Sequence, residues 1–174
     1  QPKLLEVAAR LGGSSGLFRC QGVNFALLSA FDAFDMDVSI EPNAYSIEMD
    51  RALANRYKLG IEYAHVFVDL DDCLVLRGHL NRQLVSFLHK AIAEGKRLTL
   101  ITRHRRDPEI TLREFRVSEL FDRVIHIRSK DEKKSAYIDV DNAIFIDDSH
   151  AERCDVARIH GIPVFAPDMI ESLL

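Results

Sequence analysis

Side chains that suit metal and phosphate chemistry follow short apolar runs at four places beyond residue 62. The runs have the composition of buried strands, and a parallel sheet exposes the carboxyl ends of its strands at one edge, where ligands collect. We therefore expect these side chains to meet at one rim. They are Asp69, Asp71 and Asp72 after residues 66–68, Thr102 after residues 97–101, Lys133 and Lys134 beyond residues 124–127, and Asp147 and Asp148 after residues 143–146.

The charges at this rim predict a bound divalent cation. Carboxylates crowded this closely repel one another, and keeping them ionised is costly unless a cation or a lysine neutralises them. The expected donors are oxygen atoms, with no His or Cys among them, and such a set favours Mg²⁺ over Zn²⁺. Magnesium keeps several waters and takes only one or two protein carboxylates together with substrate phosphate oxygens. The sequence therefore predicts that Mg²⁺ and a phosphate share the site.

The elements that must position these side chains alternate regularly from residue 66 onward. Strands are predicted over 66–68, 97–101, 124–127, 143–146 and 163–165. Helices are predicted before Gly95, after Asp107-Pro108, and over 149–160 before Gly161, because glycine suits the end of a helix and proline its first turn. Alternating strands and helices predict an α/β fold, a Rossmann-like arrangement of three layers around a parallel sheet.

The segment Val66-Phe67-Val68-Asp69-Leu70-Asp71-Asp72-Cys73-Leu74 resembles the first motif of the haloacid dehalogenase superfamily, a hydrophobic strand followed by Asp-x-Asp. Thr102, Lys134 and Asp147-Asp148 follow in that family's order, so the resemblance covers about residues 63–174. It implies the family's fold and a phosphatase activity. Branches of the family that act on carbon–halogen bonds lack the second acid, which is Asp71 here.

The resemblance also implies a role for each matching residue. Asp69 matches the nucleophile that attacks phosphorus, and Asp71 matches the group that protonates the leaving group and later activates water. Residues two apart on an extended segment point the same way, so both carboxylates are expected to face one phosphate. Thr102 matches the hydroxyl that binds the transferring phosphoryl group, and Lys134 the lysine that offsets its charge. The implied metal ligands are Asp69, Asp71 through its backbone carbonyl, Asp148, and Asp147 as a ligand or a support.

Some assignments stay open in the sequence. Lys130 and Lys133 compete with Lys134 for the lysine role, and Glu152, one helical turn beyond Asp148, is expected to steady the acidic cluster. His104 and its arginine neighbours form either a solvated basic face or a site for an anionic substrate beside Thr102. The family usually has Gly and Thr where this chain has Asp72 and Cys73, which predicts a tighter or more acidic loop after the nucleophile.

The spacing of the motifs leaves little room for a lid over the site. About thirty residues separate Asp69 from Thr102, and about thirty separate Thr102 from Lys134, so each interval is expected to hold one helix and its strand. The predicted domain is therefore capless. Its substrate is expected to be a phosphorylated small molecule or a larger phosphorylated substrate, recognised by side chains at the open edge of the site.

Residues 1–62 do not continue the alternation and predict a small α+β appendage, with a Gly/Ser loop over 12–16, a helix over 24–34 and a strand-like end over 51–58.

Residues 4–13 resemble the closing motif of ATP-grasp ligases, Glu-x-Asn-x-Arg followed by glycines. Glu6 and Arg10 match, whereas Ala8 replaces the metal-binding Asn, and a buried strand with a Gly-rich turn explains the same residues. Residues 22–25 are similar to the helix entry that follows this motif. The resemblance implies an ATP-grasp remnant over 1–62, with the rest of that domain missing upstream. It also leaves open that residues 63–174 are a noncatalytic, magnesium-binding regulatory module of a larger ligase.

Composition narrows the function classes further. The formal net charge of −4 argues against nonspecific nucleic-acid binding, which uses a surplus of Lys and Arg. The cysteines Cys20, Cys73 and Cys154 form no CxxC pair, which predicts neither a disulfide framework nor a zinc site and favours a reducing cytoplasm. No apolar run approaches the roughly 20 residues that span a bilayer, so no membrane partner is expected.

Overall fold

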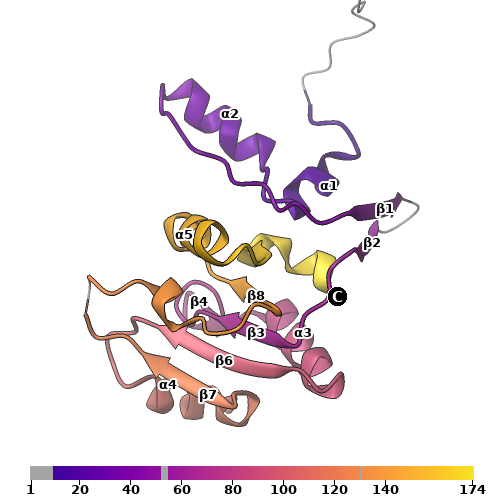
Figure 1. The fold of residues 1–174 in the computed structure, drawn as a ribbon. Helices are drawn as coiled ribbons and strands as arrows, with labels where there is room; N and C mark the ends of the chain where they lie inside the picture. The colour runs from indigo at the N-terminus through magenta and orange to yellow at the C-terminus, as the bar shows by residue number, and fades with distance from the viewer. Residues whose placement is uncertain (1–9, 52–54, 130) are drawn as a thin grey trace, which may run out of the picture.

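The computed structural model describes residues 10–51, 55–129 and 131–174 (Figure 1). Its centre is a parallel sheet of five strands in the order β7-β6-β3-β8-β9. All five strands predicted from the sequence are confirmed, within a residue or two at their ends. They are β3 (His65–Val68), β6 (Arg97–Thr102), β7 (Arg123–His126), β8 (Ala143–Ile146) and β9 (Val164–Phe165).

Helices cover both faces of this sheet and give three layers (Figure 1). Successive strand residues point to opposite faces, so Val66 and Val68 pack into one apolar cluster and Phe67 into another. The first cluster includes side chains of α3 (Arg82–Ala93), α4 (Pro108–Glu114) and the 3₁₀ helices η1 (Ser118–Leu120) and η3 (Pro167–Leu173). The second includes side chains of α5 (His150–His160). The α/β class is confirmed.

Local sequence signals fix the ends of the main helices. The side chain of Asn81 accepts a hydrogen bond from the Leu84 N–H at the start of α3, and Ser149 accepts one from Glu152 at the start of α5. Gly161 ends α5 with a φ of 65°, in the left-handed region that favours glycine. The connection from β7 to β8 differs from the regular alternation, because it contains the short 3₁₀ helix η2 (Lys134–Tyr137) in place of an α-helix.

The loop after Asp69 contains a small hairpin that the sequence analysis did not predict. Strands β4 (Val75–Leu76) and β5 (His79–Leu80) pair antiparallel around Arg77 and Gly78, whose φ angles are 49° and 77°. Two residues with positive φ make the tight turn that suits a hairpin. The expectation of a single helix and strand between Asp69 and Thr102, a stretch the structure describes throughout, is therefore corrected. The stretch holds this hairpin, α3 and β6.

The N-terminal segment forms the predicted α+β appendage. It contains α1 (Ser15–Cys20), α2 (Phe25–Ala33) and an antiparallel pair, β1 (Ile47–Arg51) and β2 (Asn55–Leu59). The predicted helix over 24–34 is confirmed, with Asn24 as its N-cap. The predicted Gly/Ser loop over 12–16 is corrected, because α1 begins at Ser15. Part of the strand-like end, residues 52–54, lies outside the described residues.

Specific polar contacts attach this segment to the edge of the sheet. The side chain of Asn43 donates to the Val164 carbonyl at 2.7 Å and accepts from the Val164 N–H at 2.9 Å, so it pairs with edge strand β9 as a neighbouring backbone would. The Tyr45 ring stacks on Phe165 with centroids 5.9 Å apart. Arg19 on α1 forms an ion pair with Glu171 on η3 at 3.1 Å.

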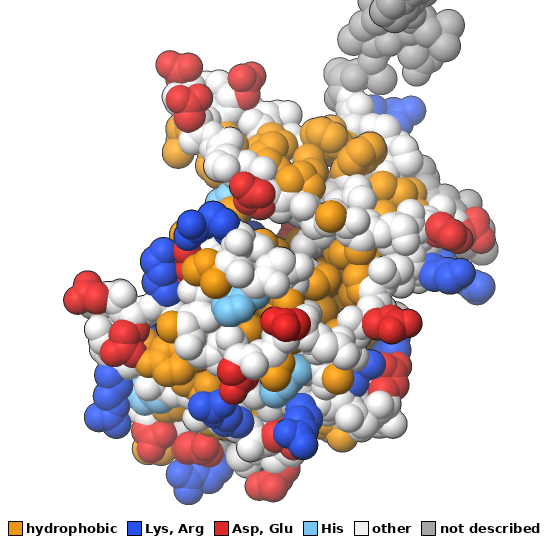
Figure 2. Space-filling model, viewed as in Figure 1, with side chains coloured by type: hydrophobic (Ala, Val, Ile, Leu, Met, Phe, Trp, Pro, Cys, Tyr) orange, Lys and Arg blue, Asp and Glu red, His pale blue; other side chains and the backbone are white. Residues whose placement is uncertain are grey.

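Apolar side chains are exposed on this N-terminal segment (Figure 2). Helix α2 buries none of its residues, and Phe34, just beyond it, is 76% exposed. The apolar core is therefore concentrated in the parallel sheet and its covering helices. Among the described residues, no helix is long and apolar enough to cross a membrane.

Candidate active site

The strand order reverses between β3 and β8, and the principal acids lie at this point. From β3 the chain adds β6 and β7 on one side and then returns to add β8 and β9 on the other. Val68 pairs with Ile146, and the Asp69 N–H donates to the Ile146 carbonyl at 2.9 Å, so Asp69 and Asp147 follow on adjacent strands. A crevice at the carboxyl ends of strands where the order reverses is the usual ligand site of such sheets.

Lys134 contacts both acids. Its Nζ lies 2.7 Å from Asp69 Oδ1 and 2.6 Å from Asp147 Oδ2, and all three side chains are buried. Lys133 points elsewhere and pairs with Asp155 at 2.8 Å, and Lys130 lies outside the described residues. The structure thus brings Lys134, rather than Lys133, to Asp69.

The buried cluster shifts the protonation of its members. Burial raises the pKa of Asp69 to about 7, with the Lys134 ammonium opposing the rise and the Asp147 carboxylate adding to it. Burial likewise raises the pKa of Asp147, against the effect of Lys134. For Lys134 burial acts to lower the pKa, but the two carboxylates together outweigh burial and raise it.

This cluster has the properties of a cation site. Oxygen atoms of Asp69, Asp147 and Asp148 lie within 4.8 Å of one another, close enough for a shared metal ion. Among the described residues, no donor makes a hydrogen bond of acceptable angle to Asp69 Oδ1, although Lys134 Nζ lies 2.7 Å from it. Three carboxylates and one ammonium leave two negative charges when all are ionised, which a divalent cation would balance. These residues could therefore hold a metal ion.

We expect the free energy of unfolding of the metal-free protein to depend on pH because Asp69 is buried. An acid whose pKa is raised on folding binds its proton more tightly in the folded state, so it lowers the free energy of unfolding as pH rises from about 4 to about 7. The contribution is of the order of a few kcal/mol, since one pKa unit corresponds to about 1.4 kcal/mol. Urea unfolding in EDTA at several pH values measures it.

The informative quantity is the difference between wild type and Asp69→Asn. Burial lowers the pKa of His65, and that group acts in the opposite direction over part of the same pH range. Asp69→Asn should lack the fall that wild type shows, whereas Asp72→Asn, outside the cluster, should keep it. Parallel pH profiles for wild type and Asp69→Asn would contradict the assigned shift.

Helix α5 contacts the backbone of Lys134 and the side chains of the residues on both sides of it. Glu152 Oε2 accepts a hydrogen bond from the Lys134 N–H at 3.2 Å. Asp155, one turn further along α5, binds Lys133 Nζ at 2.8 Å and the Ser135 hydroxyl at 2.6 Å. The predicted supporting role of Glu152 thus takes the form of a contact to the loop that presents Lys134.

Replacing Asp155 by asparagine should destabilise the protein by about 1 to 3 kcal/mol, because its partners then lose a charged acceptor at a nearly buried position. Hydrogen bonds to Lys133, Ser135 and Arg158 hold the pKa of Asp155 well below its ordinary value, so its stabilising effect is present at neutral pH. Urea denaturation at pH 7 tests this. Arg158→Gln is the matched control, since that guanidinium is 69% exposed and should change stability by less than about 0.5 kcal/mol. Equal effects of the two variants would contradict the assigned role.

The carboxylate of Asp71 faces His104. His104 Nδ1 lies 2.8 Å from Asp71 Oδ1 and 3.0 Å from Oδ2. Asp71 is therefore not part of the Asp69–Asp147–Asp148 group, and its predicted metal contact was through the backbone carbonyl only. Thr102, fully buried at the end of β6, accepts a hydrogen bond from the His104 N–H at 3.1 Å.

The contacts of Arg103 and His104 limit the basic-face interpretation to the exposed Arg105 and Arg106. Arg103 forms an ion pair with Glu152 at 2.8 Å, and the His104 side chain is only 15% exposed. Neither is a free group on a solvated face, and Arg103 is already neutralised. The sequence signal for His104 was its position two residues after Thr102, but its contact with Asp71 depends on how two loops meet.

The backbone conformation and the burial of the loop after Asp69 accommodate Asp72 and Cys73. Asp72 has a φ of 50°, in the left-handed region that favours glycine and that aspartate adopts more readily than most residues. Cys73 is buried, and burial raises the pKa of its thiol well above the ordinary value. Asp71 and Asp72 are both exposed in this loop.

Comparisons with known proteins find a likeness of fold. No protein-family model matches the chain, and no curated protein matches its sequence. The core domain of a protein from Streptococcus pneumoniae TIGR4, described as a candidate phosphoglycolate phosphatase, has a TM-score of 0.46 and 18% identity, over 61% of this chain and 80% of that one. An uncharacterized protein from Corynebacterium glutamicum ATCC 13032 has a TM-score of 0.45 and 17% identity, over 59% of this chain and 83% of that one. Function therefore has to rest on the site itself.

None of these comparisons supports the ATP-grasp resemblance of residues 1–62. Residues 1–9, which include Glu6 and Ala8, lie outside the described residues. The remnant and the boundary near residue 62 stay predictions.

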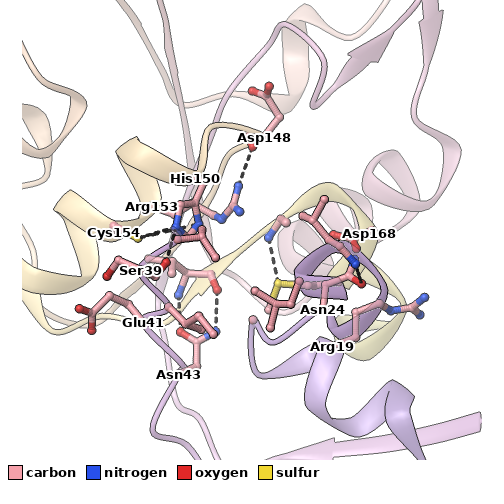
Figure 3. Close-up of a pocket in the computed structure, with 18 of the residues that line it drawn as sticks. Arg19, Asn24, Ser39, Glu41, Asn43, Asp148, His150, Arg153, Cys154 and Asp168 are labelled. Atoms are coloured by element: carbon pink, nitrogen blue, oxygen red, sulfur yellow. Dashed lines mark hydrogen bonds between the residues drawn. The ribbon is translucent and has the colours of Figure 1, made fainter. Parts of the chain in front are cut away.

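A separate cavity of about 230 Å³ lies between α2, residues 38–43 and the β9 edge (Figure 3). It reaches the acidic cluster only through Asp148, whose carboxylate points away from the other labelled side chains in Figure 3. Arg153 in its wall donates to the carbonyls of Asp147 and Asp148 at 2.6 and 2.7 Å. Arg153 therefore links the wall of this cavity to the backbone that carries these acids.

Proposed function

We propose that this protein is a magnesium-dependent phosphomonoester hydrolase that works through an aspartyl-phosphate at Asp69. One observation carries the proposal. A buried aspartate at the strand-order reversal has an oxygen without a normal hydrogen bond, beside a buried lysine and two further carboxylates. Such an oxygen is suited to a nucleophile, and the neighbouring charges are suited to hold a cation and a phosphate.

The proposed cation is Mg²⁺, held by Asp69, Asp147 and Asp148. All three donors are carboxylate oxygens, the ligand type that magnesium prefers. When bound, the ion would offset negative charge on the phosphate and on the attacking carboxylate. Lys134 supplies a fixed positive charge to the same acids at 2.6 and 2.7 Å.

The first step transfers the phosphoryl group to the protein. An oxygen of Asp69 attacks phosphorus, the bond from phosphorus to the ester oxygen breaks, and Asp71 gives its proton to the departing oxygen. We assign Thr102 the hydrogen bond to a phosphoryl oxygen, since a hydroxyl that accepts from the His104 N–H still has one hydrogen to donate.

The second step returns Asp69 to its starting state. Asp71, now ionised, takes a proton from a water molecule, which attacks phosphorus and breaks the bond to the Asp69 oxygen. Inorganic phosphate is released, and Asp71 carries a proton for the next turnover. Splitting one displacement into two in this way is the advantage of covalent catalysis.

Phosphate release from a panel of phosphorylated metabolites tests the proposal. The panel should include sugar phosphates, nucleotides, phosphorylated acids and a phosphopeptide, each with Mg²⁺ and with excess EDTA. We expect release from at least one compound with Mg²⁺ and none with EDTA. If Mg²⁺ and EDTA samples release phosphate at the same rate, or if none is released from any compound, the proposed function is wrong.

A further inference from the structure

Every polar atom of His104 has a partner. Two contacts lead into the proposed site, because the N–H donates to Thr102 Oγ1 at 3.1 Å and Nδ1 lies 2.8 Å from Asp71 Oδ1. The other two lead to the scaffold, because Nε2 lies 2.9 Å from Thr111 Oγ1 on α4 and the carbonyl accepts from His126 Nε2 at 2.8 Å. His104 therefore connects Asp71 and Thr102 to fixed parts of the fold.

Donors and acceptors can be assigned to the hydrogen bonds of the His104 ring. With Nδ1 as the donor, Asp71 Oδ1 accepts its hydrogen both when the carboxyl group is ionised and when its other oxygen carries the acid proton. The Thr111 hydroxyl on the other ring nitrogen holds the ring in this orientation. The Asp71 side chain is 52% exposed, whereas that of His104 is 15% exposed. A carboxylate with that exposure would otherwise sample several rotamers, and His104 selects one of them.

We propose that His104 is the positioning residue for the general acid and base of this protein: it holds the Asp71 carboxylate in the rotamer from which the leaving group is protonated. This inference rests on the proposed function, because it assigns a task to a neighbour of Asp71. It also gives residue 104 a role that neither a solvated face nor a substrate-binding rim would have.

The inference has a consequence that general loss of structure would not produce. Alkyl phosphates have poor leaving groups, which must be protonated as they depart, whereas nitrophenolate leaves without a proton. Displacing Asp71 should therefore reduce kcat/KM for an alkyl phosphate much more than kcat/KM for p-nitrophenyl phosphate. The ratio kcat/KM is the right quantity, because it includes only steps up to departure of the leaving group.

Two conservative variants separate the two ends of the imidazole. In His104→Asn the amide nitrogen replaces Nδ1 and can still donate to Asp71, whereas in His104→Gln the longer amide reaches the position of Nε2 and Thr111. We expect His104→Gln to lower kcat/KM for the alkyl phosphate by about 10- to 100-fold, with a change of less than about 3-fold for p-nitrophenyl phosphate. His104→Asn should stay within about 5-fold of wild type on both.

Asp71→Asn provides the reference, since it should show the same substrate dependence with a larger loss. Equal losses on both substrates in His104→Gln, or a larger loss in His104→Asn than in His104→Gln, would overturn the positioning role while leaving the proposed function intact. A wild-type protein that releases no phosphate with Mg²⁺ from these two substrates or from any compound of the panel would overturn both.

Discussion

Asp69→Asn is expected to lower turnover by at least about 10⁴-fold without unfolding the protein. The amide is nearly the same size as the carboxylate but cannot attack phosphorus, so the covalent step is lost. The fold should be retained, because burial disfavours the charged form of Asp69 and the neutral amide removes that cost. Phosphate release with Mg²⁺ and a thermal melt on the same preparation measure the two effects.

Asp71→Asn is the matched comparison for this prediction. It makes the same chemical change two residues away, at a side chain outside the buried cluster. We expect it to keep a measurable kcat/KM on p-nitrophenyl phosphate, because that leaving group needs no proton and kcat/KM does not include the later hydrolysis step in which Asp71 is the base. If Asp69→Asn retains more than about 1% of wild-type activity, Asp69 is not the nucleophile.

Magnesium should raise the melting temperature of the wild-type protein by several degrees. An ion that binds the folded carboxylates and not the unfolded chain stabilises the fold by about 2.7 kcal/mol at a concentration of 100 times Kd. For a chain of this length, 1 kcal/mol corresponds to about 2 to 4 °C. Differential scanning fluorimetry across a Mg²⁺ titration is the measurement.

Asp148→Asn should largely remove this shift, because it takes a charged donor from the cluster while leaving the buried Asp69–Lys134–Asp147 contacts in place. Asp72→Asn is the control, since Asp72 lies outside the cluster and asparagine also tolerates its φ of 50°. A wild-type melting temperature that does not change with Mg²⁺ would show that the carboxylate cluster is not a magnesium site.

The sequence was sufficient for the elements whose signals are local. The five strands are short apolar runs, and helix ends coincide with Asp107, Ser149 and Gly161, whose side chains or backbone preferences act within a few residues. The hairpin of β4 and β5 was missed because its turn is Arg77-Gly78, and Arg rarely adopts the positive φ that it has there. The start of α1 was missed because Ser15-Gly16 has the composition of a loop.

The site was predictable in its residue types but only partly in its contacts. Asp69 and Asp147 follow buried strands, so their meeting at the sheet edge depends on the strand order alone. Which of the neighbouring lysines reaches Asp69 depends on how the loop before η2 packs against α5. There Asp155 binds Lys133, and Lys134 points at Asp69. The pairing of His104 with Asp71 joins loops about thirty residues apart in sequence, and no local pattern encodes that distance.

Chemical trapping of the phosphorylated protein tests the central claim most directly. Wild-type protein would be mixed with a turned-over phosphomonoester and Mg²⁺, quenched in acid during steady state, and reduced with borohydride, which converts an aspartyl-phosphate to homoserine. Peptide mass spectrometry should then find homoserine at position 69, only when substrate is present and not in Asp69→Asn. Turnover with no homoserine at position 69, or with homoserine at another aspartate, would contradict a mechanism through Asp69.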